Sequence, residues 1–162
     1  MPPSFDIRRA EVRHAPLIAP LFDAYRQFYA QPSDLAGAEA FVRERLERRE
    51  SVIFMAVLGP DEQEGSGAED EPNVVGFVQL YPMFTSVGMR RMWILNDLFV
   101  AKAARRMGVA DALMAAAEEH ARAFGAAAIA LETQHANSGA QALYEARGWV
   151  LERDTRWYTL RL

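Results

Sequence analysis

The sequence predicts a single domain of the α/β class. We expect a mixed sheet of six to seven strands, mostly antiparallel, with one central parallel strand pair and helices on both faces. The 162 residues are 51% hydrophobic and 25% charged, which is the balance of an ordinary globular protein. Strand-like segments in adjacent runs favour antiparallel pairing, and a strand–helix–strand unit over residues 92–133 favours a right-handed parallel crossover.

The first half of the chain predicts one strand, two helices and a hairpin. Residues 5–10 alternate apolar and charged side chains, which is typical of a strand. Apolar side chains recur every three or four residues over 16–29 and again over 35–46, which predicts two helices. The segments 51–59 and 73–84 are rich in β-branched and aromatic residues, so we expect them to pair as a hairpin.

The linker between the two hairpin strands has an unusual composition. Residues 60–72 are rich in Asp and Glu and carry almost no apolar side chain. We interpret this segment as a mobile acidic loop, and a solvated tip without a function is the simplest explanation for it.

The second half predicts the central part of the sheet. Residues 90–100 form an apolar run that is typical of a buried strand, and 107–124 carry one helical apolar stripe that ends before a glycine. Residues 126–133 read as the next strand. A short helix capped by Asn137 or Ser138 should follow, and 149–162 should supply a final strand pair.

Composition excludes several classes of protein. The net charge of −4 and the pI near 5.4 argue against a general nucleic-acid binder, which needs a basic excess. The chain has no cysteine, so it has no disulfide, thiolate nucleophile or cysteine metal site, and the spacing of its histidines suits no metal site either. No apolar run reaches 18 residues and no secretory signal is visible, so we expect a cytoplasmic protein without a membrane span.

The stretch RRMGVADAL, residues 105–113, has the composition of an anion-binding helix start. Unpaired amide hydrogens and a partial positive charge gather at a helix N-terminus. Gly108 permits a close approach of the backbone to a phosphate, Ala110 presents only a methyl group, and Arg105, Arg106 and Lys102 can add charge-assisted contacts. The alternative is that Gly108 and Ala110 serve only close packing of the helix on the sheet.

A second constellation lies in the short helix near the C-terminus. Asn137 and Tyr144 are two helical turns apart, so they share one helix face about 10 Å apart, with Ala140 between them. This face is suited to line a cleft. A tyrosine with a packed ring and a wet hydroxyl is an equally good explanation of Tyr144 alone.

Three successive motifs resemble those of a known superfamily. LNDLFV, RRMGVADAL and ETQHANSGAQALYEARGW are similar to the motifs of the GNAT superfamily, the acyl-CoA-dependent N-acetyltransferases. The resemblance extends over nearly the whole chain, because the expected order of elements also matches the GNAT fold. Within the superfamily, the motif spacing is most similar to that of the spermidine/spermine acetyltransferases and other small-amine enzymes.

The resemblance implies that the chain uses acetyl-CoA as cosubstrate and no metal. It implies that the 105–110 loop holds the pyrophosphate, that the adjoining strand pairs with the pantetheine arm, that Asn137 faces the cofactor, and that Tyr144 is the general acid near its sulfur. The cofactor-binding residues expected on this basis are Leu98, Phe99, Val100, Arg105, Arg106, Met107, Gly108, Val109, Ala110, Asn137, Ala140 and Leu143.

Acetyl transfer to an amine also needs a base. An alkyl amine with a pKa near 10.4 is neutral in only about one molecule in two thousand at pH 7, so a carboxylate should remove its proton. Asp97 and Glu132 are the candidates, and Asp97 is favoured because it interrupts an apolar run. A structural aspartate is the alternative. The polyamine enzymes carry glutamate where this chain has Asn96, which leaves both the base and a polyamine acceptor open.

The expected acceptor is a small molecule with a primary amine. Tyr25, Arg26 and Tyr29 in the first helix, with Asn96, are the candidate acceptor-binding residues. A small amine, polyamine or amino acid is the first choice, and a protein lysine or N-terminus is the second. The alternative function is a non-catalytic acyl-CoA-binding regulatory module. We also expect a homodimer, because the apolar end WYTLRL provides an edge for pairing.

Overall fold

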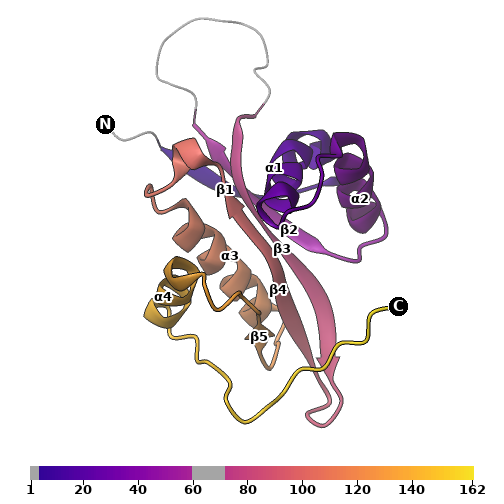
Figure 1. Ribbon diagram of the computed structural model, residues 1–162, viewed down its shortest axis with the longest axis vertical. Helices are drawn as coiled ribbons and strands as arrows, with labels where there is room; N and C mark the ends of the chain where they lie inside the picture. The colour runs from indigo at the N-terminus through magenta and orange to yellow at the C-terminus, as the bar shows by residue number, and fades with distance from the viewer. Residues whose placement is uncertain (1–3, 60–71) are drawn as a thin grey trace, which may run out of the picture. The chain divides into compact units, whose positions relative to one another are not determined.

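The computed structural model describes residues 4–59 and 72–162 (Figure 1). The chain divides into two compact units, residues 1–131 and 132–162, and each unit is described on its own. The expected mobile acidic loop at 60–72 lies outside the described residues, except for Pro72.

The first unit is built on a five-stranded mixed sheet whose spatial order follows the chain. The strands are β1 (Phe5–Arg9), β2 (Val52–Leu58), β3 (Val74–Thr85), β4 (Arg90–Val100) and β5 (Ile129–Ala130). Neighbouring strands from β1 to β4 run antiparallel, and β5 runs parallel to β4. The predicted mixed sheet with a parallel strand pair is therefore confirmed.

Helices cover both faces of this sheet, as the sequence predicts. The helices of the first unit are α1 (Ala15–Phe28), α2 (Leu35–Glu47) and α3 (Val109–Ala123), with short 3₁₀ turns η1 (Val12–His14) and η2 (Lys102–Ala104). Figure 1 shows α1 and α2 on one face and α3 on the other. The second unit contains α4 (Ser138–Ala146). None of the helices in the described ranges is long and apolar enough to span a membrane.

The strand prediction was wrong in two places. The strand expected over 126–133 is only Ile129–Ala130, and no strand occurs within 149–162. The parallel pair consequently lies at the end of the described sheet instead of its centre. A strand needs a partner and a buried face to fix its register, whereas the side chains of Trp157, Tyr158 and Leu160 are at least 80% exposed.

The core between the sheet and α1–α2 is aromatic. Phe22 of α1 packs against Phe41 of α2 and against Phe77 of β3, with ring centroids 5.6 and 6.0 Å apart. Ile18 lies one turn earlier on the same face of α1 and is fully buried. Burial of each such side chain stabilises the fold by about 1.5 to 3 kcal/mol, so this face fixes α1 on the sheet.

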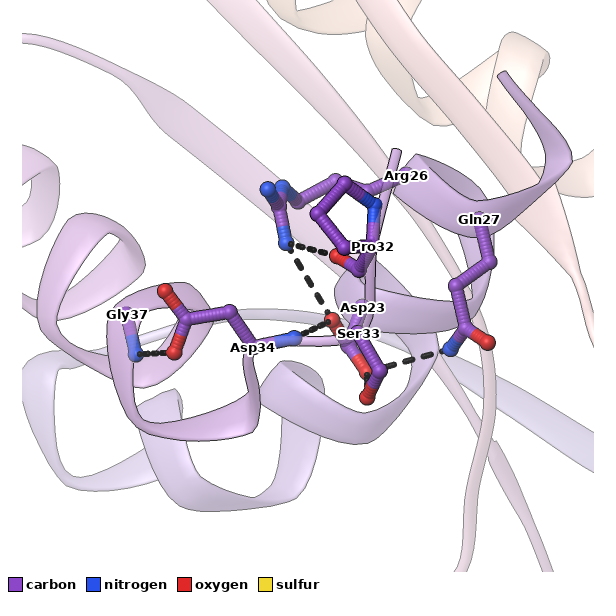
Figure 2. A network of polar contacts seen from close by, with 7 residues as sticks. All are labelled: Asp23, Arg26, Gln27, Pro32, Ser33, Asp34 and Gly37. Atoms are coloured by element: carbon purple, nitrogen blue, oxygen red, sulfur yellow. Dashed lines mark hydrogen bonds and ion pairs between the residues drawn. The ribbon is translucent and has the colours of Figure 1, made fainter. Parts of the chain in front are cut away.

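One carboxylate holds the connection between α1 and α2 (Figure 2). Asp23 of α1 is only 5% exposed. One of its oxygens accepts hydrogen bonds from the Asp34 amide at 2.8 Å and from Arg26 at 3.3 Å. The other oxygen accepts from the Ser33 hydroxyl at 2.7 Å and from the Gln27 amide at 3.1 Å. The end of α1 and the start of α2 are thus fixed relative to each other.

This network predicts a pH-dependent contribution to stability. The hydrogen bonds from the Asp34 amide and the Ser33 hydroxyl lower the pKa of Asp23 below its usual 3.8. A lowered pKa in the folded state stabilises the protein above the pKa of the unfolded state, and this contribution is lost as the pH falls through the folded pKa. We expect Asp23→Asn to unfold at a lower temperature than the wild type at neutral pH. The difference should shrink below pH 3.8.

Thermal unfolding followed by circular dichroism between pH 2 and 7 measures this difference. The matched control is Asp6→Asn, since the Asp6 side chain is 71% exposed and pairs with the exposed Arg8 at 3.3 Å. An equal and pH-independent loss in both variants would refute the role of Asp23.

Candidate active site

The segment between β4 and α3 has an unusual backbone. Arg106 and Gly108 both have positive φ angles, +65° and +81°, and Gly108 is the N-cap of α3. Arg105 donates its amide hydrogen to the Lys102 carbonyl at 3.4 Å. The amides of residues 106–110 donate to no backbone carbonyl in the parts of the chain that the structure describes. The helix start therefore presents a row of free N–H groups.

Most residues of this segment are accessible, whereas Val109, also a predicted cofactor-binding residue, has a buried side chain. Arg105, Arg106 and Gly108 are exposed, and Met107 and Ala110 are half-buried. The guanidinium of Arg105 donates to the carbonyl of Val100 at 3.3 Å, which fixes it at the end of β4. Two arginines beside a helix N-terminus create a positive potential that suits an anion such as a phosphate.

The strand that leads into this segment has one free edge within the first unit. β4 pairs with β3 along its whole length, but it pairs with β5 only at Trp93 and Ile94. In the sheet, the edge of β4 over residues 95–100 consequently has no strand partner, and this stretch includes Leu98, Phe99 and Val100. Such an edge can bind an extended amide-containing ligand through the backbone.

A β-bulge at Asn96 reorients the middle of β4. Gln79 pairs with Asp97 and the next residue, Leu80, pairs with Leu95, so Asn96 is the extra residue of the bulge. The bulge leaves Asn96 exposed and places Asp97 in the interior, where it is only 5% exposed.

Asp97 is surrounded by neutral hydrogen-bond donors. The side-chain amide of Gln79 donates to one carboxylate oxygen at 2.7 Å, and that of Asn96 donates to the other at 3.1 Å. Burial raises the pKa of Asp97, and hydrogen bonds from Gln79, Asn96 and Tyr25 lower it. No Lys, Arg or His in the described ranges forms an ion pair with Asp97. A carboxylate without a counter-ion is suited to accept a proton or to hold a cation.

Of the three candidate acceptor residues at the end of α1, Tyr25 lies near Asp97 and Tyr29 packs on Tyr25. The hydroxyl of Tyr25 donates to the Asn96 carbonyl at 3.4 Å, and burial followed by the charge of Asp97 raises the pKa of Tyr25. The exposed ring of Tyr29 packs edge to face on that of Tyr25, with centroids 5.1 Å apart. Arg26 instead donates to Asp23 and to the Pro32 carbonyl, which gives it a structural contact.

The second unit presents the other predicted residues on α4. The Asn137 side chain caps the helix by accepting from the Ala140 amide at 3.3 Å, as the sequence predicts. The ring of Tyr144 lies 6.1 Å from that of Trp149, and Ala140 and Leu143 are half-buried. Tyr144 therefore has a packed ring.

Glu132 is not on a strand. It was expected beside Asp97 on the adjoining strand, but β5 ends at Ala130 and Glu132 is the first residue of the second unit. Because β5 is so short, strand pairing does not bring Glu132 beside Asp97.

Sequence reasoning missed Gln79. Its side chain is completely buried, and it faces Asp97 across the β3–β4 ladder. The available signal was a single amide side chain inside the apolar run of 74–84, because such a residue is buried only with a partner. No group of three or more His, Asp or Glu side chains suited to a metal occurs among residues 4–59 and 72–162.

Comparison with known proteins agrees with this architecture. Residues 20–149 match the model of the acetyltransferase (GNAT) family. The chain is 47% identical over 150 residues to the Bacillus subtilis (strain 168) protein named "Uncharacterized N-acetyltransferase YhfO", covering 93% of this chain and 91% of that protein. A crystal structure of a probable acetyltransferase is 39% identical, with a TM-score of 0.85 and 97% of both chains covered.

The chain belongs to the GNAT family and is an acetyltransferase. Its fold is also shared by the aminoglycoside N-acetyltransferase AAC(6')-Iy, whose structure was solved in complex with CoA. That protein is 20% identical, with a TM-score of 0.73 and coverage of 100% of this chain and 98% of the other. At this identity the likeness concerns the fold alone.

The backbone of the anion-binding segment gives a stability prediction. Gly108 has a φ of +81°, where a Cβ is strained even though no atom lies within 4 Å of its position. We expect Gly108→Ala to lower the free energy of unfolding by about 1 kcal/mol. Gly139 in α4 also has open space and no positive φ. Gly139→Ala should leave stability unchanged or raise it by up to about 1 kcal/mol.

Urea unfolding of both variants measures this contrast. Equal changes in the two variants would show that the conformation at residue 108 does not require glycine.

Proposed function

We propose that this protein transfers the acetyl group of acetyl-CoA directly to the primary amine of a small acceptor. The observation that carries the proposal is the buried carboxylate of Asp97. It has neutral donors and, among residues 4–59 and 72–162, no counter-ion, and it lies on the strand with the free edge. A small amine, polyamine or amino acid is the preferred acceptor, and a protein lysine or N-terminus is the second choice.

Acetyl-CoA supplies the activated acetyl thioester, and residues of β4, of the segment that follows it and of α4 would hold the cofactor. The free amides of residues 106–110 and the guanidinium groups of Arg105 and Arg106 suit a pyrophosphate. The free edge of β4 at Leu98–Val100 suits the amides of a pantetheine arm. On α4, Asn137, Ala140 and Leu143 complete the proposed set.

The chemistry requires a neutral nucleophile. Neutralising an alkyl ammonium at pH 7 costs roughly 4 to 5 kcal/mol, and a base beside it removes the proton. We assign this role to Asp97, with Glu132 as the second candidate. The amine nitrogen attacks the thioester carbonyl, the C–S bond breaks, and Tyr144 protonates the leaving thiolate. No covalent acyl-enzyme is needed, because bringing amine and thioester together removes much of the entropic barrier.

The acceptor side is aromatic. The rings of Tyr25 and Tyr29 lie edge to face, and Phe99 of β4 lies 6.2 Å from Tyr25. Aromatic rings bind ammonium groups through cation–π contacts, and Asn96 adds an exposed polar side chain beside them. This combination favours an acceptor with a cationic amine.

We further propose that residues 1–162 act as one catalytic domain in a cytoplasmic homodimer. The absence of cysteine suits a reducing compartment. The exposed Trp157, Tyr158 and Leu160 offer apolar surface for a contact with a second copy. We expect light scattering at micromolar concentration to give the mass of a dimer, and a monomeric mass would contradict it.

The role of Tyr144 is tested by Tyr144→Phe. We expect kcat to fall by about 10²- to 10⁴-fold, because general acid catalysis contributes that much, while the Kd for acetyl-CoA changes little. CoA release measured across a panel of monoamines, polyamines, amino acids and aminoglycosides gives kcat, and calorimetry gives Kd. An unchanged kcat would refute the assignment. Tight acetyl-CoA binding by the wild type without turnover on any amine would support the non-catalytic module instead.

A further inference from the structure

The side chain of Gln79 is buried with only one end of its amide satisfied. It is 0% exposed, and its Nε2 donates to the Asp97 carboxylate at 2.7 Å. Its Oε1 has no hydrogen-bond partner in the part of the chain that the structure describes. An unpaired buried carbonyl destabilises the fold, so packing alone would favour an apolar residue at this position.

The position of Gln79 is fixed by the sheet. Gln79 and Asp97 are direct partners in the antiparallel β3–β4 ladder, immediately beside the bulge at Asn96. Cross-strand partners have their Cβ atoms about 5 Å apart, so the two side chains are brought together by the backbone itself. The register of the two strands thus brings the Gln79 side chain to Asp97.

A side-chain amide can form a hydrogen bond with either protonation state of a carboxyl group. It carries a donor and an acceptor at equivalent positions, and rotation by half a turn exchanges them. The Nε2–H group suits a carboxylate, and Oε1 suits the O–H of a protonated carboxyl. The side-chain amide of Asn96 lies next in the chain to Asp97, is exposed and already contacts the other oxygen.

We propose that Gln79 is a positioning residue for Asp97, which holds the ionised carboxylate through Nε2–H and, after a half-turn of the amide, accepts a hydrogen bond from the protonated carboxyl through Oε1. This inference rests on the proposed function of Asp97 as the base. The unpaired Oε1 is then the acceptor that is used once Asp97 has taken the proton of the amine.

Side chains from three elements surround Asp97, and the charge of Asp97 affects the pKa values of two of them. Tyr25 reaches it from α1, Asn96 is on β4, and Tyr81 is on β3. Burial and then the charge of Asp97 raise the pKa of Tyr81 to about 12, whereas Arg45 of α2 and the Gln79 amide lower it. Both tyrosines remain neutral at physiological pH, so Asp97 is the group of this cluster that changes charge.

The test is Gln79→Met, which keeps the length and packing of the side chain and removes the amide. The matched control is Gln27→Met, since Gln27 also donates its amide to an aspartate, Asp23, at 3.1 Å. The pKa of the Asp97 carboxyl is measured by ¹³C NMR, with Asp97→Asn to identify the signal. The pH dependence of kcat/KM is measured on the same proteins.

We expect Gln79→Met to raise the pKa of Asp97, because the charge-assisted hydrogen bond that the ionised form loses is stronger than the neutral one that the protonated form loses. Gln27→Met should leave this pKa in place. The acidic limb of kcat/KM should move with it, so that activity at the acidic end falls about tenfold relative to the plateau. An Asp97 carboxyl that titrates identically in Gln79→Met and the wild type would overturn the proposal.

A measurement on the wild type covers the case in which Gln79→Met does not fold. The ¹⁵N resonance of the Gln79 side-chain amide should shift with pH at the same midpoint as the Asp97 carboxyl, and a resonance that does not respond would overturn the proposal. If the carboxyl titration moves in Gln79→Met but the kcat/KM profile does not, Gln79 positions Asp97 and the assignment of Asp97 as the base is wrong.

Discussion

The structure of the first unit depends on how β4 pairs. β4 is held to β3 over its full length and to β5 at only Trp93 and Ile94. Beyond β5, the described sheet therefore ends in a free backbone edge of β4. The same strand leads directly into η2 and the start of α3, so the free edge and the free amides of 106–110 follow each other in the chain. A rigid strand next to a helix N-terminus provides preorganised binding groups.

The bulge at Asn96 determines on which face of the sheet the Asp97 side chain lies. Without the extra residue, the side chains of β4 would alternate between the two faces of the sheet without interruption. The bulge instead shifts the pairing of β3 with β4 between Gln79 and Leu80. The shift lets Asp97 point to the α1 side while Leu95 and Trp93 are buried in the core. Burying a carboxylate is unfavourable unless it is hydrogen-bonded, and the side-chain amides of Gln79 and Asn96 donate to Asp97 without neutralising its charge.

The sequence predicted much of this site because several residues carry strong local signals. Gly108 before an apolar helical stripe marked the start of α3, Asn137 marked the cap of α4, and Asp97 stood out within an apolar run. Gln79 was missed because its contact with Asp97 depends on the register between β3 and β4, which the sequence of one strand does not show. The segment 149–162 has the composition of strands but lacks a ladder, since pairing depends on a partner that composition does not specify.

In the proposed function, the free edge of β4 and the amides at the start of α3 form one binding surface for acetyl-CoA. A ¹H–¹⁵N NMR titration of the protein with acetyl-CoA, with the backbone amides assigned, tests this surface directly. We expect the largest shifts and the strongest protection from hydrogen exchange at residues 98–100 and 106–110. Saturable binding with those amides unperturbed, or no binding at all, would contradict it.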